Sequence, residues 1–438
     1  MPIPWLLANE RRAMWLMAIV GFISRMMVAP FLGHKYDVRA YLTWTEYFQR
    51  NSLGSFYGAT LSTPPDHLPG DLMIFAAIGR LAPWLFQDFS FESWYAELII
   101  RLVPITSDIL LGVIAYLFVR GRQGGPVGLL AAACIIFNPG LFTVSAIWGQ
   151  WDSFAAVILL GTIMLALRGN TVIIWPLMMY QILIKPQYAV FGLLLAFYLI
   201  RLALTTGPVS DERARKSPMH LARDIAIGVP LSLLAFAAIC FPFGVGFPGQ
   251  VGMQWTISER VSFAVNRYND ITLGAQNLWS IFGKRLGDPD SLLLVGTLTY
   301  SSAGRILLAA FVVIAIVTTV VRAPADWALL CGSFIAAMSI YSLPTRVHER
   351  YMMPTLVLIL VMWPMARRLL PIAFGLTITY TVSLILAMWW DAPIRLSYVD
   401  FALALANLTL FGWAVAEMFR ATRYRWKAPH SLITALKS

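Results

Sequence analysis

Long apolar stretches recur along nearly the whole chain, separated by shorter polar segments. A helix needs about 20 mainly apolar residues to cross a bilayer, and lipid offers backbone groups no hydrogen-bond partners outside helices and closed barrels. The stretches lack the alternation of barrel strands, so they predict spanning helices. The twelve predicted spans are 13–33, 98–119, 126–147, 153–167, 171–184, 187–201, 225–243, 303–321, 327–343, 351–366, 370–390 and 398–419. We therefore expect an all-α polytopic membrane protein in which residues 1–438 form a single transmembrane domain.

A weaker apolar stretch, 72–86, is interrupted by Arg80 and Pro83. A charge and a helix-breaking residue both argue against a plain span. If this stretch spanned, the short basic loop at Arg120 and Arg122 would fall on the outer side. We therefore predict that 72–86 is a re-entrant or juxtamembrane helix in the first extracytoplasmic loop.

Basic residues in short loops set the predicted orientation, because such loops stay on the cytoplasmic side. The basic sites that this orientation places inside are Arg11/Arg12, Arg120/Arg122, Arg367/Arg368 and the tail Arg420/Arg423/Arg425/Lys427. Both termini are then cytoplasmic, as is the loop 202–224. The long segments 34–97 and 244–302 are extracytoplasmic, over the cavity predicted below. We expect the protein in the inner or plasma membrane of a prokaryote.

Composition agrees with a membrane protein and excludes several other classes. The chain is 59% hydrophobic and only 13% charged, whereas soluble domains are about a quarter charged. The net charge of +11, from 33 Lys and Arg against 22 Asp and Glu, fits cationic loop ends better than a nucleic-acid surface. Three scattered cysteines make neither a disulfide framework nor a metal site.

Polar clusters gather on one face under this topology. They are Tyr36–Arg39, Trp148–Asp152, Lys185–Gln187 and Val347–Tyr351. An ionisable group at membrane depth costs about 2.5–3.5 kcal/mol and normally is paired or faces a cavity. Acids and bases supplied by four separate loops to one side therefore predict a shared extracytoplasmic cavity.

Asp37 is the strongest candidate for a catalytic residue in this cavity. It lies just beyond the first span, between Tyr36 and Arg39, where it can stay ionised and accept a proton. The alternative from the residue alone is a solvated acid at the membrane interface. A lone interfacial acid would have no catalytic partner.

Cations suited to a phosphate follow later in the chain. His348, Glu349 and Arg350 place an imidazole, an acid and a planar guanidinium together, and guanidinium binds phosphate oxygens in pairs. Because Pro186 can break a helix, Lys185 before it can face a cavity. The alternative for Arg350 is a side chain that snorkels to the interface, beside a histidine whose hydrogen bonds are already satisfied. The alternative for Lys185 is a simple anchor at the membrane interface.

A polar group at the end of a span consists of Gln150, Trp151 and Asp152. Aromatic and amide contacts of this kind suit a carbohydrate. The alternative is that the residues belong to an interfacial aromatic belt. Asp108 and Arg25 lie deeper in apolar stretches, and we interpret them as a structural pair. The chain has no Walker motif, CxxC or HExxH, and its other histidines lack metal-ligand spacing.

These clusters, in this order, resemble the GT-C class of membrane glycosyltransferases. The likeness is to dolichyl-phosphate-glucose glucosyltransferases of asparagine-linked-glycan assembly and to bacterial mannosyltransferases related to the second GPI mannosyltransferase. The matching stretches are Tyr36–Trp44, Pro64–Pro65, Trp148–Ser153, Ala275–Trp279 and Val347–Arg350. Arg350 stands where the family motif has lysine, and Asp66–Pro69 interrupts the family's Tyr-Pro-Pro-Leu stretch.

The resemblance implies an inverting hexosyltransferase that moves mannose or glucose from a polyprenyl-phosphate donor to a glycan or glycolipid acceptor. It implies Asp37 as general base, with Lys185, His348 and Arg350 on the donor phosphate. The residues expected to bind or orient sugar or acceptor are Tyr36, Arg39, Trp44, Gln150, Trp151, Asp152 and Glu349. No cofactor is expected, although Asp37 with Asp152 could hold a divalent metal. Besides the donor and the acceptor, the expected partners are membrane lipids, and no nucleic acid is expected.

Two other functions remain open from the sequence. A transporter or flippase of lipid-linked sugars would show inverted repeats and polar groups at mid-depth, and we find neither. A lipid-linked-glycan ligase or polymerase would use similar cations but transfer a whole glycan. The sequence separates this third function poorly from the first.

The topology makes the first testable prediction. Cysteine introduced at position 37 or at position 348 should react with a membrane-impermeant thiol reagent added from outside. The native cysteines all lie in apolar stretches, so they should remain unlabelled and serve as the control. Labelling of only one of the two positions from that side would contradict both the topology and the shared cavity.

Overall fold

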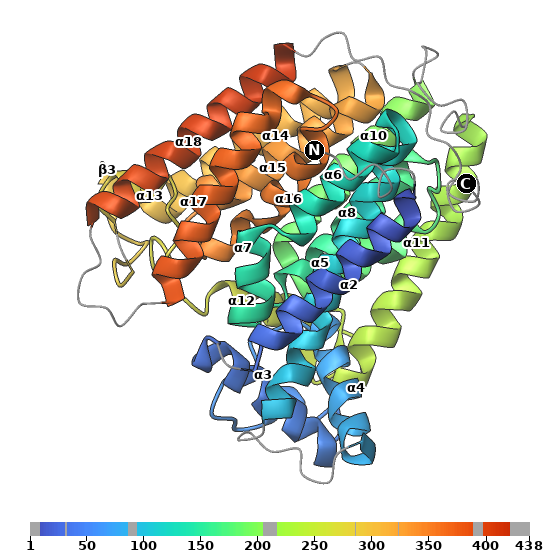
Figure 1. Cartoon of the computed structure of the whole chain (residues 1–438). Helices are drawn as coiled ribbons and strands as arrows, with labels where there is room; N and C mark the ends of the chain where they lie inside the picture. Colours follow the sequence, from blue (N-terminus) through green and yellow to red (C-terminus); the bar gives the residue numbers. More distant parts are fainter. Residues whose placement is uncertain are drawn as a thin grey trace.

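The computed structural model describes residues 9–30, 33–85, 94–204, 217–284, 286–322, 324–388 and 397–420. Most of the predicted cytoplasmic loop 202–224 and the basic tail after Arg420 lie outside these ranges. So does the C-terminal end of the predicted span 370–390. Figure 1 shows an elongated helical bundle.

Helices build the described part of the chain almost entirely. The first half contains α2 (Glu10–Val28), α3 (Lys35–Arg50), η1 (Phe56–Gly58), α4 (Pro69–Leu85), α5 (Trp94–Gln123), α6 (Gly125–Ile136), α7 (Pro139–Phe142), η2 (Thr143–Trp148), α8 (Asp152–Leu167), α9 (Ile174–Ile184), η3 (Pro186–Tyr188) and α10 (Ala189–Leu204). The second half contains α11 (Pro218–Cys240), η5 (Phe241–Phe243), α12 (Ile257–Val265), α13 (Leu278–Ile281), α14 (Tyr300–Val321), α15 (Ala325–Ser342), η6 (Glu349–Met352), α16 (Met353–Met362), η7 (Arg367–Leu369), α17 (Leu370–Met388) and α18 (Ser397–Arg420).

Four short strands lie in the segment 244–302. Strand β1 (Val245–Gly246) pairs in parallel with β2 (Trp255–Thr256), and β3 (Leu293–Val295) pairs antiparallel with β4 (Leu298–Thr299). These two-stranded pairs fold the long segment back on the bundle. The predicted all-α class is confirmed, with these pairs as a local addition.

Every predicted span contains a helix, but twelve spans are not confirmed. Within the described ranges, seven helices are long and apolar enough to cross a membrane, and a pair bent by 42°, α6 with α7–η2, makes an eighth. Three helices are too short for a bilayer core of about 30 Å at about 1.5 Å per residue. They are α8, α9 and α16, with 16, 11 and 10 residues.

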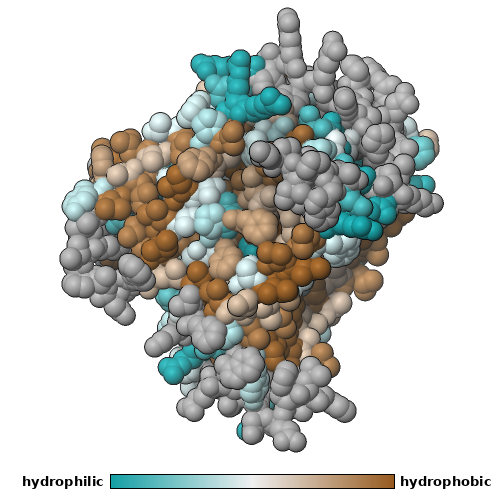
Figure 2. Space-filling model, in the orientation of Figure 1, coloured by the Kyte–Doolittle hydropathy of each residue, from teal (hydrophilic) through white to brown (hydrophobic). Residues whose placement is uncertain are grey.

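Apolar side chains face both outward and inward in this bundle. Helix α2 exposes Trp15, Ile19, Ile23 and Met27, and Figure 2 shows hydrophobic surface across the middle of the molecule. Large contiguous apolar patches are rare on soluble monomers, so this surface suits a lipid environment. By contrast, all eighteen residues of α15 and all ten of α16 are buried by protein.

Residues 72–85 lie in α4, which packs on α3. Both helices lie together at the lower end of the bundle in Figure 1. With 17 residues, α4 is shorter than the seven span-capable helices. The re-entrant or juxtamembrane placement of 72–86 stays a prediction.

The deep pair Arg25 and Asp108 joins several helices, as expected. Arg25 Nε on α2 lies 2.9 Å from Asp108 Oδ2 on α5, and both side chains are fully buried. Ser145 of η2 and Ser153 of α8 also donate to this carboxylate, at 2.6 and 2.5 Å. One buried carboxylate thus connects four elements of the bundle that supports the site.

Removing one partner of this pair should destabilise the fold strongly. Asp108→Ala leaves the Arg25 charge buried without a counter-charge, which costs about 3–5 kcal/mol. We expect a clear fall in the thermal unfolding midpoint of the purified protein in detergent. The double variant Arg25→Met/Asp108→Leu should recover part of the loss, whereas a wild-type midpoint for Asp108→Ala would contradict a structural role.

Candidate active site

A cavity of about 900 Å³ collects the four polar clusters predicted from the sequence. The predicted residues that line it are Tyr36, Asp37, Trp44, Gln150, Trp151, Lys185, His348, Glu349 and Arg350. They come from the start of α3, the turn before α8, the break after α9 and the start of η6. Both long segments, 34–97 and 244–302, contribute to its wall.

Helix geometry decides which side chains of α3 face the cavity. Asp37, Tyr41 and Trp44 are spaced at i, i+4 and i+7, which places them on one helical face, and all three line the cavity. Arg39 follows Asp37 by two residues, about 200° around the helix. It is exposed and is not among the lining residues, so the expected orienting role of Arg39 has no support in the geometry.

Two hydrogen bonds and a nearby histidine hold one oxygen of Asp37. Its Oδ2 accepts hydrogen bonds from Trp148 Nε1 at 2.8 Å and from Gln150 Nε2 at 2.6 Å, and His34 Nδ1 lies 3.2 Å away. Tyr41 donates to Gln150 Oε1 at 2.7 Å, which fixes the amide. Among the residues that the structure describes, these contacts all end on Oδ2, so Oδ1 is left to accept a proton from a ligand.

The electrostatic surroundings keep Asp37 ionised. Burial by itself would raise the pKa of the carboxyl, but the His34 hydrogen bond and the positive charge of Arg350 hold the pKa well below its ordinary value. A carboxylate in this state is ionised throughout the neutral range, and the low pKa makes it a weak base in the empty site.

A left-handed glycine makes the turn that presents Gln150. Gly149 has φ +89°, and the backbone N–H groups of Gly149 and Gln150 both donate to Val144 O, at 3.1 and 2.9 Å. This closes η2, a π-helix, before α8 begins. A Cβ at position 149 would lie 2.9 Å from Arg101 Nε and 3.0 Å from Val38 Cγ2, so only glycine fits without strain.

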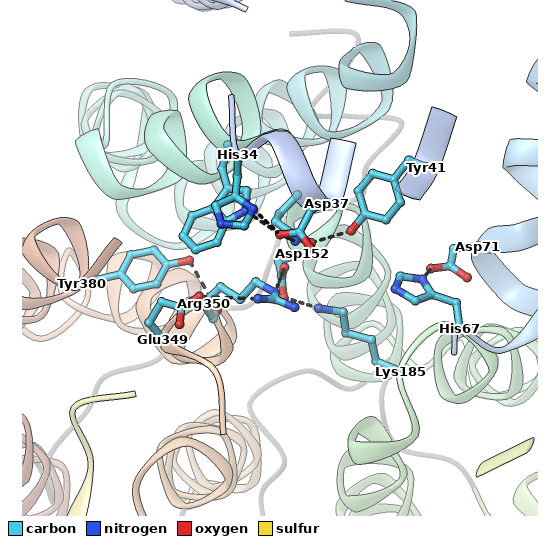
Figure 3. A network of polar contacts seen from close by, with 12 residues as sticks. His34, Asp37, Tyr41, His67, Asp71, Asp152, Lys185, Glu349, Arg350 and Tyr380 are labelled. Atoms are coloured by element: carbon cyan, nitrogen blue, oxygen red, sulfur yellow. Dashed lines mark hydrogen bonds and ion pairs between the residues drawn. The ribbon is translucent and has the colours of Figure 1, made fainter. Parts of the chain in front are cut away.

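Asp152 holds the two cations of the site together. It is the first residue of α8 and is 2% exposed. Its Oδ1 is bonded to Lys185 Nζ, and its Oδ2 lies 3.6 Å from Arg350 Nε. Figure 3 shows both cationic side chains reaching toward this carboxylate. Asp152 does not line the main cavity, so its position suits orientation of cations better than direct contact with sugar.

Interruptions of the helical backbone orient Lys185 and Arg350 toward the cavity. Lys185 has an extended backbone between α9 and η3, which confirms that Pro186 interrupts the helix. Arg350 lies in the first turn of η6, with Nη1 3.5 Å from Glu349 Oε1. Ionised neighbours Asp37 and Glu349 outweigh burial and raise the pKa of Arg350, so its charge is permanent.

The loop before η6 is fixed by a bidentate ion pair. Arg346 has φ +62°, an uncommon conformation for a non-glycine residue, and binds Asp290 through Nε and Nη2 at 2.7 and 3.2 Å. Leu273 N donates to Val347 O at 3.0 Å. These contacts carry His348 to the cavity wall.

His348 lies in the loop directly before η6, at the N-cap position but without a side-chain capping hydrogen bond. The 3₁₀-helix, however, begins at Glu349, and the α-helix only at Met353, where the sequence suggested a helix start near Tyr351. Burial first, and then the charge of Arg350, hold the pKa of His348 well below its ordinary value. A low pKa favours the neutral imidazole, which can still donate one hydrogen bond.

Several lining residues were given no role from the sequence, although Tyr41 and Trp148 lie within its matching stretches. They are His34, Tyr41, Asp66, His67, Asp71, Trp148 and Tyr268. Tyr41 could have been found by extending the helical period from Asp37. The others reach the cavity through tertiary packing, for which single-sequence patterns give no signal.

The described residues contain no group of three or more His, Cys, Asp or Glu placed to hold a metal ion. Asp37 and Asp152, named above as possible metal ligands, point instead at N–H donors and cations. This donor set does not fit a metal. No step below therefore uses one.

No protein-family model and no curated protein sequence matches this chain. The structure resembles that of the oligosaccharyltransferase from Archaeoglobus fulgidus, solved with a tethered acceptor peptide, with a TM-score of 0.50 and 15% sequence identity. The likeness covers 98% of this chain and 57% of the archaeal enzyme, so this chain spans little more than half of that length. At this identity it concerns the fold, and it confirms the GT-C-like fold class predicted from the sequence.

The turn at Gly149 gives a prediction with a matched control. Gly149→Ala forces a left-handed alanine, which costs about 1–2 kcal/mol before any contact with Arg101. Gly161→Ala, on α8, meets nothing within 4 Å and replaces a helical glycine, so it should be neutral or stabilising by up to about 1 kcal/mol. Thermal unfolding in detergent compares the two variants, and equal midpoints would contradict the strained turn.

Proposed function

We propose that this chain is a GT-C-type membrane glycosyltransferase that transfers a hexose, mannose or glucose, from a polyprenyl-phosphate donor. The acceptor is an extracytoplasmic glycan or glycolipid, and Asp37 is the general base. One observation carries this proposal: a single cavity holds a carboxylate with an open oxygen and a pair of cations anchored on Asp152.

The cation pair suits a departing phosphate. Lys185 and Arg350 together carry +2 and Asp152 carries −1, so the three-residue group leaves a net charge of +1 (2 − 1). Burial raises the pKa of Glu349, the carboxyl beside Arg350. Fixed cations in a site shielded from water stabilise charge that develops in the transition state, with no reorganisation needed.

The proposed step balances without a cofactor. The acceptor hydroxyl oxygen forms a bond to the anomeric carbon as the bond from that carbon to the phosphate oxygen breaks on the opposite face. The hydroxyl proton passes to Asp37 Oδ1, and the electron pair leaves on the polyprenyl phosphate. The anomeric configuration inverts, and Arg350 and Lys185 receive the new phosphate charge with His348 as a neutral donor.

Part of the cavity wall is apolar. It includes Val190, Leu308, Ile340 and Ala387, which come from α10, α14, α15 and α17. The segments Pro186–Leu204 (η3 with α10) and Arg367–Met388 (η7 with α17), together with α14 and α15, are long and apolar enough to span a membrane, and α15 is enclosed by protein. We propose that the first isoprene units lie along this apolar wall, so that the donor arrives from the bilayer at its phosphate.

A second candidate is transfer of a whole glycan. It is favoured by the fold likeness to an oligosaccharyltransferase, whose structure holds an acceptor peptide. The cavity volume of about 900 Å³ is near the upper end of typical small-ligand pockets, about 300–1,000 Å³. This size suits one lipid-linked hexose with part of an acceptor better than a long glycan.

Two variants should separate the base from the phosphate site. Asp37→Asn keeps size and hydrogen bonding but cannot take the proton, so transfer should fall by about 10² or more while donor binding stays near that of the wild type. Arg350→Ala should instead lose donor binding. Purified variants are assayed for binding and turnover of labelled polyprenyl-phosphate-mannose and -glucose.

Asp37→Glu should retain little activity, because an oxygen misplaced by about an ångström can cost about 10²-fold. Arg39→Gln is the matched control, since Arg39 lies on α3 but off the cavity. Transfer at the wild-type rate by folded, donor-binding Asp37→Asn would remove Asp37 as the base. Unchanged donor binding by Arg350→Ala would remove Arg350 from the phosphate site.

A further inference from the structure

A histidine–aspartate pair lies on the cavity wall beside the proposed phosphate site, and none of the proposed steps uses it. His67 Nδ1 is bonded to Asp71 Oδ2, four residues further along the chain. The His67 side chain is 26% exposed, whereas that of Asp71 is 2% exposed. Both residues line the same cavity as Asp37 and Lys185. The histidine therefore faces the cavity, with the carboxylate behind it.

The surrounding rings fix the orientation of His67. Its ring meets Trp44 edge-on at 4.8 Å between centroids and Tyr41 at 5.8 Å. Its backbone carbonyl accepts a hydrogen bond from Tyr57 Oη at 2.9 Å. Figure 3 shows the ring nitrogen that is not bonded to Asp71 pointing away from it, toward the side where Lys185 lies. The His67 ring nitrogen that is not bonded to Asp71 is therefore oriented toward the cavity in the ligand-free protein.

Burying the charge of Asp71 costs free energy unless a partner such as His67 offsets it. Asp71 lies in the first turn of α4, where the helix dipole favours an acid. Among described residues, its other oxygen, Oδ1, is buried without a hydrogen-bond partner. A buried ion is destabilising unless it is paired, so the cost of burial favours the contact between Asp71 and His67.

The pair suits a sugar hydroxyl better than a phosphate. Together, an imidazolium and a carboxylate carry no net charge, whereas the cations at Lys185 and Arg350 already serve the phosphate. Burial would lower the pKa of His67, but the charge of Asp71 raises it above its ordinary value, with Asp66 adding to the rise and Lys185 opposing it. The outward nitrogen therefore carries a proton to donate over a wider pH range.

We propose that His67, oriented by Asp71, donates a hydrogen bond to a hydroxyl of the hexose on the donor and so selects which sugar is transferred. The proposal rests on the proposed function, because it needs a sugar held between the phosphate cations and Asp37. It also gives a purpose to Asp66–Pro69, the stretch at which this sequence departs from the resembled family. Asp71 is a positioning residue that acts through His67.

Binding with and without the sugar tests the proposal. The purified full-length protein in detergent is titrated with polyprenyl-phosphate-mannose, polyprenyl-phosphate-glucose and sugar-free polyprenyl phosphate. His67→Gln should weaken binding of the preferred sugar-bearing lipid by about tenfold or more, the order expected for a lost charged hydrogen bond, and leave the sugar-free lipid unaffected. Asp71→Asn should shift the same ratio in the same direction. His220→Gln makes the same substitution at the start of α11, away from the cavity, and should change neither affinity.

Deoxy donors supply a second measurement, and its first arm needs only the wild-type protein. With the wild-type protein, removal of one particular hydroxyl should cost about the same tenfold, and in His67→Gln that hydroxyl should no longer matter. Equal losses for sugar-bearing and sugar-free lipids, or a wild-type that ignores every deoxy donor, would overturn the sugar contact. Failure of the wild-type to bind either lipid would overturn the proposed function itself, a result distinct from failure of the His67 contact.

Discussion

The buried carboxylate of Asp152 is the constraint on which the geometry of the site depends. An ion that is 2% exposed must have counter-charges, and it finds them in Lys185 and Arg350. These cations belong to segments 33 and 198 residues away in the chain, so one ion group draws together the start of α8, the end of α9 and η6. Arg350 then supplies the field that keeps Asp37 ionised across the cavity.

That arrangement lets one residue serve two sides of the proposed reaction. Arg350 lowers the pKa of Asp37, the proposed base, and is also the proposed contact of the leaving phosphate. When a phosphate binds, it competes with Asp37 and Asp152 for this guanidinium, so the carboxylate becomes a better proton acceptor once the donor is in place. A depressed pKa in the empty site is therefore compatible with a base that works only in the complex.

The sequence predicted most of this site, because motif residues at loop ends converge when the apolar stretches fold as antiparallel helices. Arg39 lies off the cavity because Lys35–Arg50 forms a helix, so its predicted role gains no support. The charge of His348 depends on neighbours that only the tertiary fold supplies. His67 and Asp71 meet through a chain bend before α4, for which the sequence offers no periodic signal.

The number of spans could not be predicted for a different physical reason. Hydropathy records only that a stretch avoids water, and a helix enclosed by other helices avoids water as fully as one in lipid. Helices α15 and α16 are entirely buried by protein. Helix α16, with 10 residues, has the apolarity of a span without its length, so twelve apolar stretches do not require twelve crossings.

The most direct test of the central claim is the fate of the donor sugar. The purified protein, in vesicles that contain a bacterial lipid extract as acceptor, is given polyprenyl-phosphate-mannose or polyprenyl-phosphate-glucose labelled in the sugar. The account predicts release of free polyprenyl phosphate in step with a product in which the anomeric configuration of the hexose is inverted, with no nucleotide sugar present. Retention of configuration, or transport of intact donor across the vesicle membrane without cleavage, would contradict it.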